Sequence, residues 1–157
     1  MKYNVSWLPK LIEFDSSKED LNEYIEKVYK IFVEDYINQG VFFKNEKLGL
    51  KRIPLRNGKE ATFYHIVSEG EDEENRAVNL DRCARIRWAK AILESNYVGL
   101  KIWENKRRRK KNILVWFTEK DYLVVIRKNP NQKLFWTAYP VTREHTKEKL
   151  EIGRAHV

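Results

Sequence analysis

The chain has 157 residues, a hydrophobic fraction of 42%, an aromatic fraction of 13% and a formal net charge of +8. This length fits one domain with a real hydrophobic core, and the composition excludes a disordered chain. No apolar run approaches the ~20 residues of a membrane span, and no signal-peptide core opens the chain. The single cysteine, Cys83, permits no internal disulfide, so we expect a cytoplasmic protein without membrane contact. The positive charge favours a polyanionic partner.

The first predicted element is a long amphipathic helix over residues 15–40. Ser17 and Asp20 have the spacing of a capping box, and Gly40 stands where a C-terminal cap belongs. Residues 41–63 are predicted to be short extended pieces, with Asn57-Gly58 at a hairpin-type turn. The predicted core stripe of the helix consists of Leu21, Ile25, Val28, Phe32 and Tyr36.

An acidic loop follows a short structured piece that contains His65, and five carboxylates fall within residues 69–74. We interpret this run as a solvated loop; the alternative is a negative lip that orients a nucleic acid by repulsion. Residues 80–95 then follow helical periodicity, with Arg82 and Arg85 opposite the apolar face. Arg87 would fall on that apolar face, so we predict a break near residues 86–87.

In the last third the hydrophobic period changes to that of strands. Four apolar segments cover residues 99–104, 112–117, 122–128 and 133–141. The short connections between these segments predict antiparallel pairing. The segment "TREHTKEKL" that follows is predicted to start another helix. The order predicts an α+β domain in which N-terminal helices pack on one face of a C-terminal four-stranded antiparallel sheet.

The last seven residues, "EIGRAHV", look foreign to the chain. They match, in one reading frame, the translation of a common sequencing adapter whose next codon is a stop. We therefore expect residues 151–157 to be an artefact, and we exclude them, His156 included, from functional reasoning. Their charges cancel, so the positive net charge does not depend on them.

Six consecutive cations, residues 106–111, fall in the predicted turn between the first two strands of the sheet. Such a run repels itself unless an anion relieves it, and each phosphate that it neutralises releases counterions. We therefore predict contact with a nucleic acid, RNA or DNA; the alternative is an ordinary solvated turn. Trp103 and Trp136, expected on neighbouring strands, are candidate stacking faces for unpaired bases, worth ~1–3 kcal/mol each. The candidate cations are Lys101, Lys106, Arg107, Arg108, Arg109 and Lys110.

The candidate catalytic residues include His65 and two hydroxyl side chains on the last predicted strand. Histidine is the usual proton-transfer group near neutral pH, although a histidine between aromatic and β-branched residues is often a core residue. Period-two geometry puts Thr137 and Tyr139 on one sheet face. There the two hydroxyls either donate to a phosphate or bond to local backbone. The sequence shows no Cys/His metal spacing, no Gly-rich phosphate loop and no G-x-S-x-G motif.

The order of these features resembles the barnase–EndoU–colicin–RelE-like (BECR) superfamily of metal-independent ribonucleases, especially its phage- and prophage-encoded branch. The shared order is a histidine in an early helix, arginines on the next element, and an antiparallel sheet that ends in a Thr-Ala-Tyr strand. Residues 60–150 carry it, through "FYHIVSEG", "LDRCARIRW", "KIWENKR", "ILVWF", "DYLVVI" and "LFWTAYPVTREHTKEKL". Residues 1–59 lie outside it, as an N-terminal helix and extended pieces of the same compact domain.

The resemblance implies a toxin-like endoribonuclease that needs no cofactor. The neighbouring 2′-hydroxyl attacks the phosphate and leaves a 2′,3′-cyclic phosphate and a 5′-hydroxyl. It implies that His65 is the first catalytic residue, that Arg82 and Arg85 form the cationic site, and that Thr137 and Tyr139 donate to phosphate or relay a proton. It also implies tRNA or mRNA as the substrate and an acidic inhibitor protein as a partner.

Two matters stay open at this point. The sheet has no second histidine, so the second proton-transfer group is Lys101, Tyr139 or an arginine. The protein is alternatively a non-catalytic nucleic-acid-binding module, or a phage structural or packaging-associated protein, with the same fold. Convergence of His65, Arg85 and Thr137 on one open cleft favours the enzyme, whereas a Thr137 sealed under the helices favours the binding module.

Overall fold

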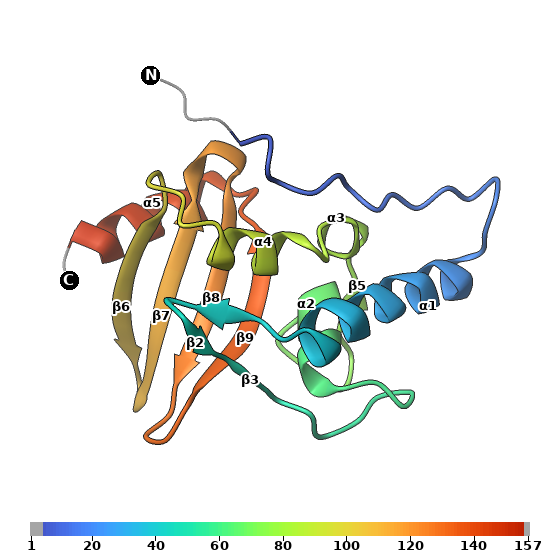
Figure 1. Cartoon of the computed structure of the whole chain (residues 1–157), viewed down its shortest axis with the longest axis horizontal. Coiled ribbons are helices and arrows are strands. Elements are labelled where there is room, and N and C mark those ends of the chain that lie inside the picture. Colours follow the sequence, from blue (N-terminus) through green and yellow to red (C-terminus); the bar gives the residue numbers. More distant parts are fainter. Residues whose placement is uncertain (1–4, 156–157) are drawn as a thin grey trace.

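A five-stranded mixed sheet forms the centre of the protein in a computed structural model that describes residues 5–155 (Figure 1). Four strands form consecutive antiparallel hairpins, as predicted, and a short fifth strand pairs in parallel with the last of them. The sheet order is β3-β9-β8-β7-β6. The strands are β3 (Gly49–Leu50), β6 (Lys101–Arg107), β7 (Lys110–Phe117), β8 (Tyr122–Lys128) and β9 (Lys133–Pro140).

The fifth strand corrects the prediction of a four-stranded antiparallel sheet. β9 would otherwise be an edge strand with unpaired backbone groups, and β3 covers part of that edge by pairing Gly49 with Leu134 and Leu50 with Phe135. Two residues are too few to show strand periodicity, which is why the sequence did not reveal β3. At the other edge, no further strand of residues 5–155 pairs with β6.

Helices and short ladders complete the α+β fold. The helices are α1 (Leu21–Phe32), continued by the π-helical segment η1 (Val33–Asn38), α2 (Ala61–Val67), α3 (Leu80–Ala84), α4 (Trp88–Glu94) and α5 (Glu144–Ala155), with a 3₁₀ turn η2 (Thr118–Lys120). The ladders pair β1 (Phe42–Phe43) with β2 (Glu46–Lys47) and β4 (Ser68–Glu69) with β5 (Ala77–Val78).

The first helix starts later than predicted. Its N-cap is Asp20, whose side chain accepts from the backbone of Glu23, 2.8 Å away, while Glu23 reaches back to the Asp20 backbone. Ser17 instead donates to Asp15 in the turn before the helix. Leu21, at the first helical position, is therefore 44% exposed and is not part of the core. The rest of the predicted stripe is confirmed, since Val28, Phe32 and Tyr36 are buried and Ile25 packs against them.

Two predictions about local chain direction are confirmed. Asn57 and Gly58 both have positive φ, at 51° and 77°, and their neighbours Arg56 and Lys59 exchange backbone hydrogen bonds. The helical segment over residues 80–95 breaks between α3 and α4. The break lets Arg87 avoid the apolar face, and its Nε lies 3.8 Å from Asp35 of η1.

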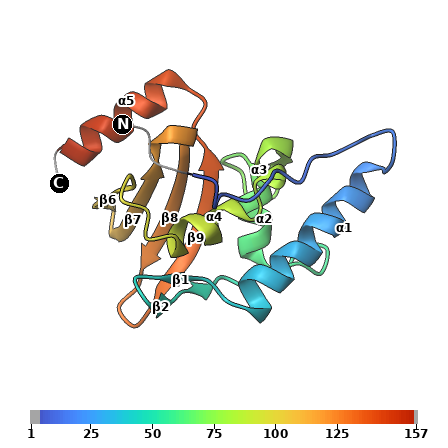
Figure 2. The same ribbon diagram turned by 45° about the horizontal axis from the view of Figure 1, so that its top comes forward.

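Apolar side chains fill both faces of the sheet. The larger cluster joins α1, α2 and α4 to one face through residues such as Phe32, Ile92 and Phe135. A smaller cluster, which includes Trp103 and Leu123, lies on the opposite face with Leu150 of α5 packed against it. The helices before the sheet thus cover one face, as predicted, and α5 covers the other (Figure 2).

Helix α5 runs without a break through residues 151–155, so the expected boundary after Leu150 stays a prediction. Among residues 5–155, no helix has the length and apolar character needed to cross a membrane.

Candidate functional site

A groove with two compartments runs over the sheet face that carries the smaller apolar cluster, from α5 to α2. The α2 compartment, of about 1110 Å³, lies toward α2 and the loop after β4. The α5 compartment, of about 870 Å³, lies beneath α5. The residues that line both are Arg107, Trp136, Thr137, Tyr139 and Thr146.

A β-bulge in β9 sets the floor of this groove. Val125 of β8 pairs with Thr137, but Ile126 pairs with Phe135, so Trp136 is an extra residue. The bulge places Trp136 and Thr137 together on the groove side, while Phe135 stays fully buried in the larger core cluster. Tyr139 follows Thr137 on the same side, which confirms that the two hydroxyls share one sheet face.

His65 lies at the edge of the α2 compartment, where α2 meets the acidic loop. Its side chain is only 11% exposed, its Nε2 lies 2.7 Å from the Glu73 carboxylate, and its ring centroid is 6.0 Å from that of Trp136. Burial alone raises the pKa of Glu73. The hydrogen bond to His65 and the nearby positive charges outweigh burial and hold that pKa below its usual range. One carboxylate of the acidic loop is therefore a partner of His65 rather than only a solvated charge.

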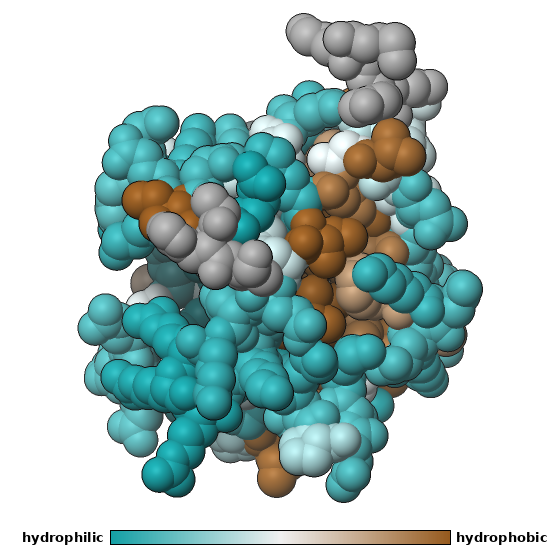
Figure 3. Space-filling view, turned by 90° about the vertical axis from the view of Figure 1, so that its left-hand side faces the viewer, coloured by the Kyte–Doolittle hydropathy of each residue, from teal (hydrophilic) through white to brown (hydrophobic). Residues whose placement is uncertain are grey.

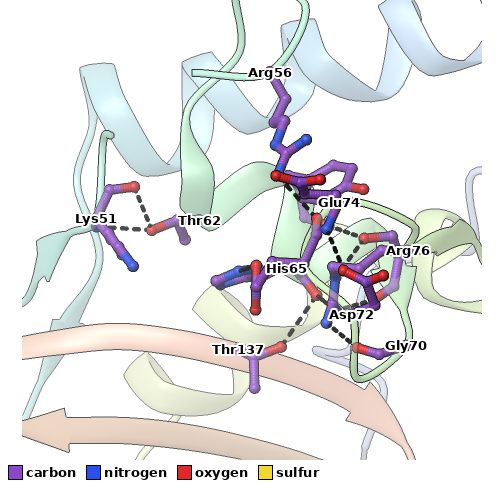
Figure 4. Close-up of polar contacts among 12 residues, drawn as sticks. Lys51, Arg56, Thr62, His65, Gly70, Asp72, Glu74, Arg76 and Thr137 are labelled. Atoms are coloured by element: carbon purple, nitrogen blue, oxygen red, sulfur yellow. Dashed lines mark hydrogen bonds and ion pairs between the residues drawn. The ribbon is translucent and has the colours of Figure 1, made fainter. Parts of the chain in front are cut away.

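The backbone carbonyl of His65 accepts hydrogen bonds from three side chains, and Figure 4 shows two of them, Thr137 and Arg76. It accepts from Thr137 Oγ1 at 3.3 Å, from Arg82 Nη1 at 3.2 Å and from Arg76 Nη2 at 3.3 Å. The same Arg82 and Arg76 nitrogens each lie 2.6 Å from the Ser68 carbonyl oxygen. Two arginines thus donate to the carbonyl groups at the C-terminal end of α2. Arg82, which we expected to hold a phosphate, therefore uses one terminal nitrogen for hydrogen bonds to the backbone.

Arg82 and Tyr139 stack at the far side of the α2 compartment. The guanidinium carbon lies 4.9 Å from the centre of the phenol ring. Burial and the charge of Arg76 lower the pKa of Arg82, and burial raises the pKa of Tyr139 despite the nearby Arg82 and Arg107. Tyr139 therefore keeps its proton near neutral pH, and its hydroxyl can donate a hydrogen bond into the groove.

Arg85 does not join the other candidates. Its guanidinium lies over the ring of Trp88 at 5.1 Å, and its Nη1 donates to the Asp81 carbonyl at 2.9 Å. Arg85 is the C-cap of α3, and the chain turns there toward α4. The expected convergence therefore holds for His65 and Thr137 and fails for Arg85. Thr137 is half-buried and lines the open groove, so it is not sealed under the helices.

Two further predictions about β6 are wrong. Trp103 and Trp136 are not on neighbouring strands, because β7 and β8 separate β6 from β9. Trp103 is also only 6% exposed, so its ring is not available for stacking as the chain stands. Lys101 lines neither compartment; its Nζ lies 3.0 Å from Glu151 of α5.

The cationic turn borders the α5 compartment. Figure 3 shows that hydrophilic side chains cover much of this side of the molecule. Residues 108–109 make the turn, and Lys106, Arg107 and Lys110 stand on the strand ends. Lys106 is exposed and lies outside both linings. No carboxylate lines this compartment among residues 5–155. Its cations are Arg107, Arg108, Arg109, Lys110, Arg127 and Lys149.

Glu73, Arg76 and Arg127 line the groove but were not among the site residues predicted from the sequence. Glu73 and Arg76 gave no usable signal, because contacts across a loop do not follow a fixed spacing. Arg127 was open to prediction, since it follows Val125 by two residues on an apolar strand and so shares its face. A charged residue in that register on a buried strand suggests a groove rather than core.

A scan against protein-family models found no match, and neither did searches of curated proteins and of solved structures. The resemblance to the BECR ribonucleases therefore stays a prediction that rests on the residues themselves. Among residues 5–155, no cluster of three or more His, Cys, Asp or Glu side chains is placed to hold a metal ion.

Proposed function

We propose that the protein is an endoribonuclease that cleaves RNA, such as tRNA or mRNA, without a metal, by attack of the neighbouring 2′-hydroxyl. The observation that carries this proposal is the pair of His65 and Glu73, 2.7 Å apart, beside two hydroxyls on the floor of a cationic groove. A histidine with a carboxylate partner is a typical proton-transfer arrangement, and the cations supply affinity for a polyanion.

In the proposed reaction His65 takes the proton from the 2′-hydroxyl, and the freed oxygen bonds to phosphorus. Glu73 orients the imidazole ring through its contact with Nε2. The bond between phosphorus and the 5′-oxygen breaks, and the leaving oxygen takes a proton from an acid. Of the named candidates for that acid, Lys101 lies outside the groove and Tyr139 lies in it.

A specific observation favours a second candidate, a nucleic-acid-binding module without catalysis. The Thr137 hydroxyl and Arg82 Nη1 both bond to backbone carbonyls, which is a structural use of groups that the enzyme would present to phosphate. In that case the same groove binds RNA, and the contact between His65 and Glu73 only stabilises the conformation of the acidic loop.

The experiment that separates the two is incubation of total tRNA and mRNA in excess EDTA, followed by end-group analysis. We expect fragments with a 2′,3′-cyclic phosphate and a 5′-hydroxyl. His65→Gln should slow cleavage by about 10²- to 10⁴-fold, the usual effect of losing one acid–base group. The matched control is His145→Gln, because His145 is exposed on α5 and lines neither compartment.

RNA that binds but stays intact would support the binding module. Cleavage that survives in His65→Gln would contradict the role of His65. Circular dichroism of both variants shows whether each one is folded.

A further inference from the structure

Arg127 is a cation of the α5 compartment that two contacts hold in place. Its guanidinium carbon lies 3.8 Å from the centre of the Trp136 ring, and its Nε donates to Asn112 Oδ1 at 2.8 Å. These two contacts fix the plane of the fork, and Arg127 lines the α5 compartment. Within residues 5–155 no carboxylate forms an ion pair with it.

The absence of a carboxylate partner within the described residues matters because the Arg127 side chain is half-buried. Burial lowers its pKa, yet an arginine side chain does not lose its proton in a protein. A partly buried charge without a partner costs free energy, which a bound anion would recover. The planar fork suits two oxygens of one phosphate.

The surroundings also favour an anion in this compartment rather than in its neighbour. Five further cations line it, and carboxylates are absent from its lining within the described residues. The α2 compartment, in contrast, has Glu69, Glu71 and Glu73 along its wall. Since walls of one charge sign concentrate the opposite sign, phosphates of a bound strand should enter beneath α5.

The floor of the α5 compartment is apolar, with Leu114 from β7 and Leu123 and Val125 from β8. Two polar atoms at its β6 side, Trp103 Nε1 and Asn105 Oδ1, are buried and have no hydrogen-bond partner. Such atoms are rare in folded proteins and call for a partner, such as a bound ligand or water. An apolar floor with one donor, one acceptor and a cationic rim matches a nucleotide, whose base has both kinds of edge group.

We propose that the α5 compartment is a nucleotide subsite for single-stranded RNA, in which Arg127 grips a phosphate and the apolar floor receives the adjoining base. This inference rests on the proposed function, since it takes RNA as the ligand of the groove. It also gives the phosphate-holding role to Arg127 in place of Arg82, which is occupied at the end of α2. The cavity volume of about 870 Å³ is ample for one nucleotide.

The test measures binding with a probe that cannot be cleaved, a tetranucleotide with 2′-O-methyl groups, followed by tryptophan fluorescence or calorimetry. Arg127→Gln should weaken binding at least 10-fold, and Arg127→Lys should weaken it several-fold because a lysine keeps the charge without the fork. The matched control is Arg52→Gln, an exposed arginine that lines neither compartment, and it should stay within about twofold of wild type.

Three smaller probes separate the base from the phosphate: inorganic phosphate, a nucleoside, and the nucleoside monophosphate. We expect the monophosphate to bind more tightly than either part, and Arg127→Gln to weaken only the probes that carry phosphate. Equal binding of inorganic phosphate and the monophosphate would overturn the base pocket and leave a simple anion site.

Equal affinity of folded Arg127→Gln and wild type for the tetranucleotide would overturn the subsite. If the glutamine variant does not fold, Arg127→Lys decides in the same way, and wild-type affinity in that variant has the same meaning. The outcome is distinct from that of the cleavage assay, because a protein that binds the blocked tetranucleotide through Arg127 and fails to cut RNA contradicts only the proposed catalysis.

Discussion

The hydroxyl of Thr137 donates to the backbone carbonyl of His65 across 3.3 Å, and so joins the last strand of the sheet to helix α2. The two residues are 72 positions apart in the chain. This contact means that Thr137 positions the candidate proton-transfer residue, whether or not its hydroxyl also reaches a phosphate.

Replacing Thr137 with valine keeps the shape of the side chain and removes the hydroxyl. We expect a loss of ~1 kcal/mol in the free energy of unfolding, the usual contribution of one hydrogen bond. Cleavage should slow by about 10- to 100-fold because His65 shifts, while RNA affinity should change little. Urea unfolding and single-turnover cleavage measure the two effects. Full activity together with lower stability would mean that this part of β9 is purely structural.

Arg76 should matter for stability more than its place beside an exposed loop suggests. It donates to Ser68 Oγ and to the backbone carbonyls of Gly70, Ser68 and His65. Arg76→Ala should therefore lower the free energy of unfolding by about 1–3 kcal/mol, because carbonyls at the end of α2 lose their donors. Arg109→Ala, in the exposed turn, is the control and should change stability by less than ~0.5 kcal/mol. Denaturant titration of both variants checks the difference.

Glu73 should contribute to stability in a pH-dependent way. Its pKa in the folded protein is depressed, so its contribution is present above the unfolded value of about 4.3 and is lost as the pH falls through the folded value. Glu73→Gln should thus be less stable than wild type at pH 7 and equal to it near pH 2. The difference should stay below ~1 kcal/mol, since the side chain is 61% exposed. A difference that persists at low pH would show that packing, not charge, is responsible.

The cationic turn should govern the salt dependence of RNA binding. Replacing Arg107, Arg108 and Arg109 with alanine removes up to three phosphate contacts. The slope of log affinity against log salt should then fall in magnitude by about 2 for single-stranded RNA. Folding should be unaffected, because all three side chains are exposed. An unchanged slope in filter-binding titrations would show that the turn does not touch RNA.

The parts of the fold that follow from periodicity could be predicted from the sequence. The hairpins β6–β9, the helix break before Arg87 and the Asn57-Gly58 turn each depend on neighbours within a few residues. β3 could not be predicted in this way, because two residues carry no period and its partner β9 lies more than 80 positions away.

For the candidate site, too, local spacing could be predicted from the sequence and contacts between distant segments could not. Thr137 and Tyr139 share a face by strand geometry, and their place in the groove with His65 agrees with the expected order of elements. Arg85 was wrongly predicted because the turn after α3 sets the direction of its side chain. Lys101 was wrongly predicted because it forms an ion pair with Glu151 of α5. Glu73, Arg76 and Asn112 act through contacts between segments, which depend on packing and leave no spacing in the sequence.

The bulge at Trp136 has a consequence for the whole last strand. Strict alternation would put Phe135, Thr137 and Tyr139 on one side, so that the core phenylalanine and both hydroxyls would compete for the same face. The inserted residue reverses the parity of everything after it, and Phe135 and Ala138 become the inward pair instead. Deleting one residue here would therefore exchange groove and core along half the strand. The site is thus encoded by the number of residues in β9 as much as by their chemistry.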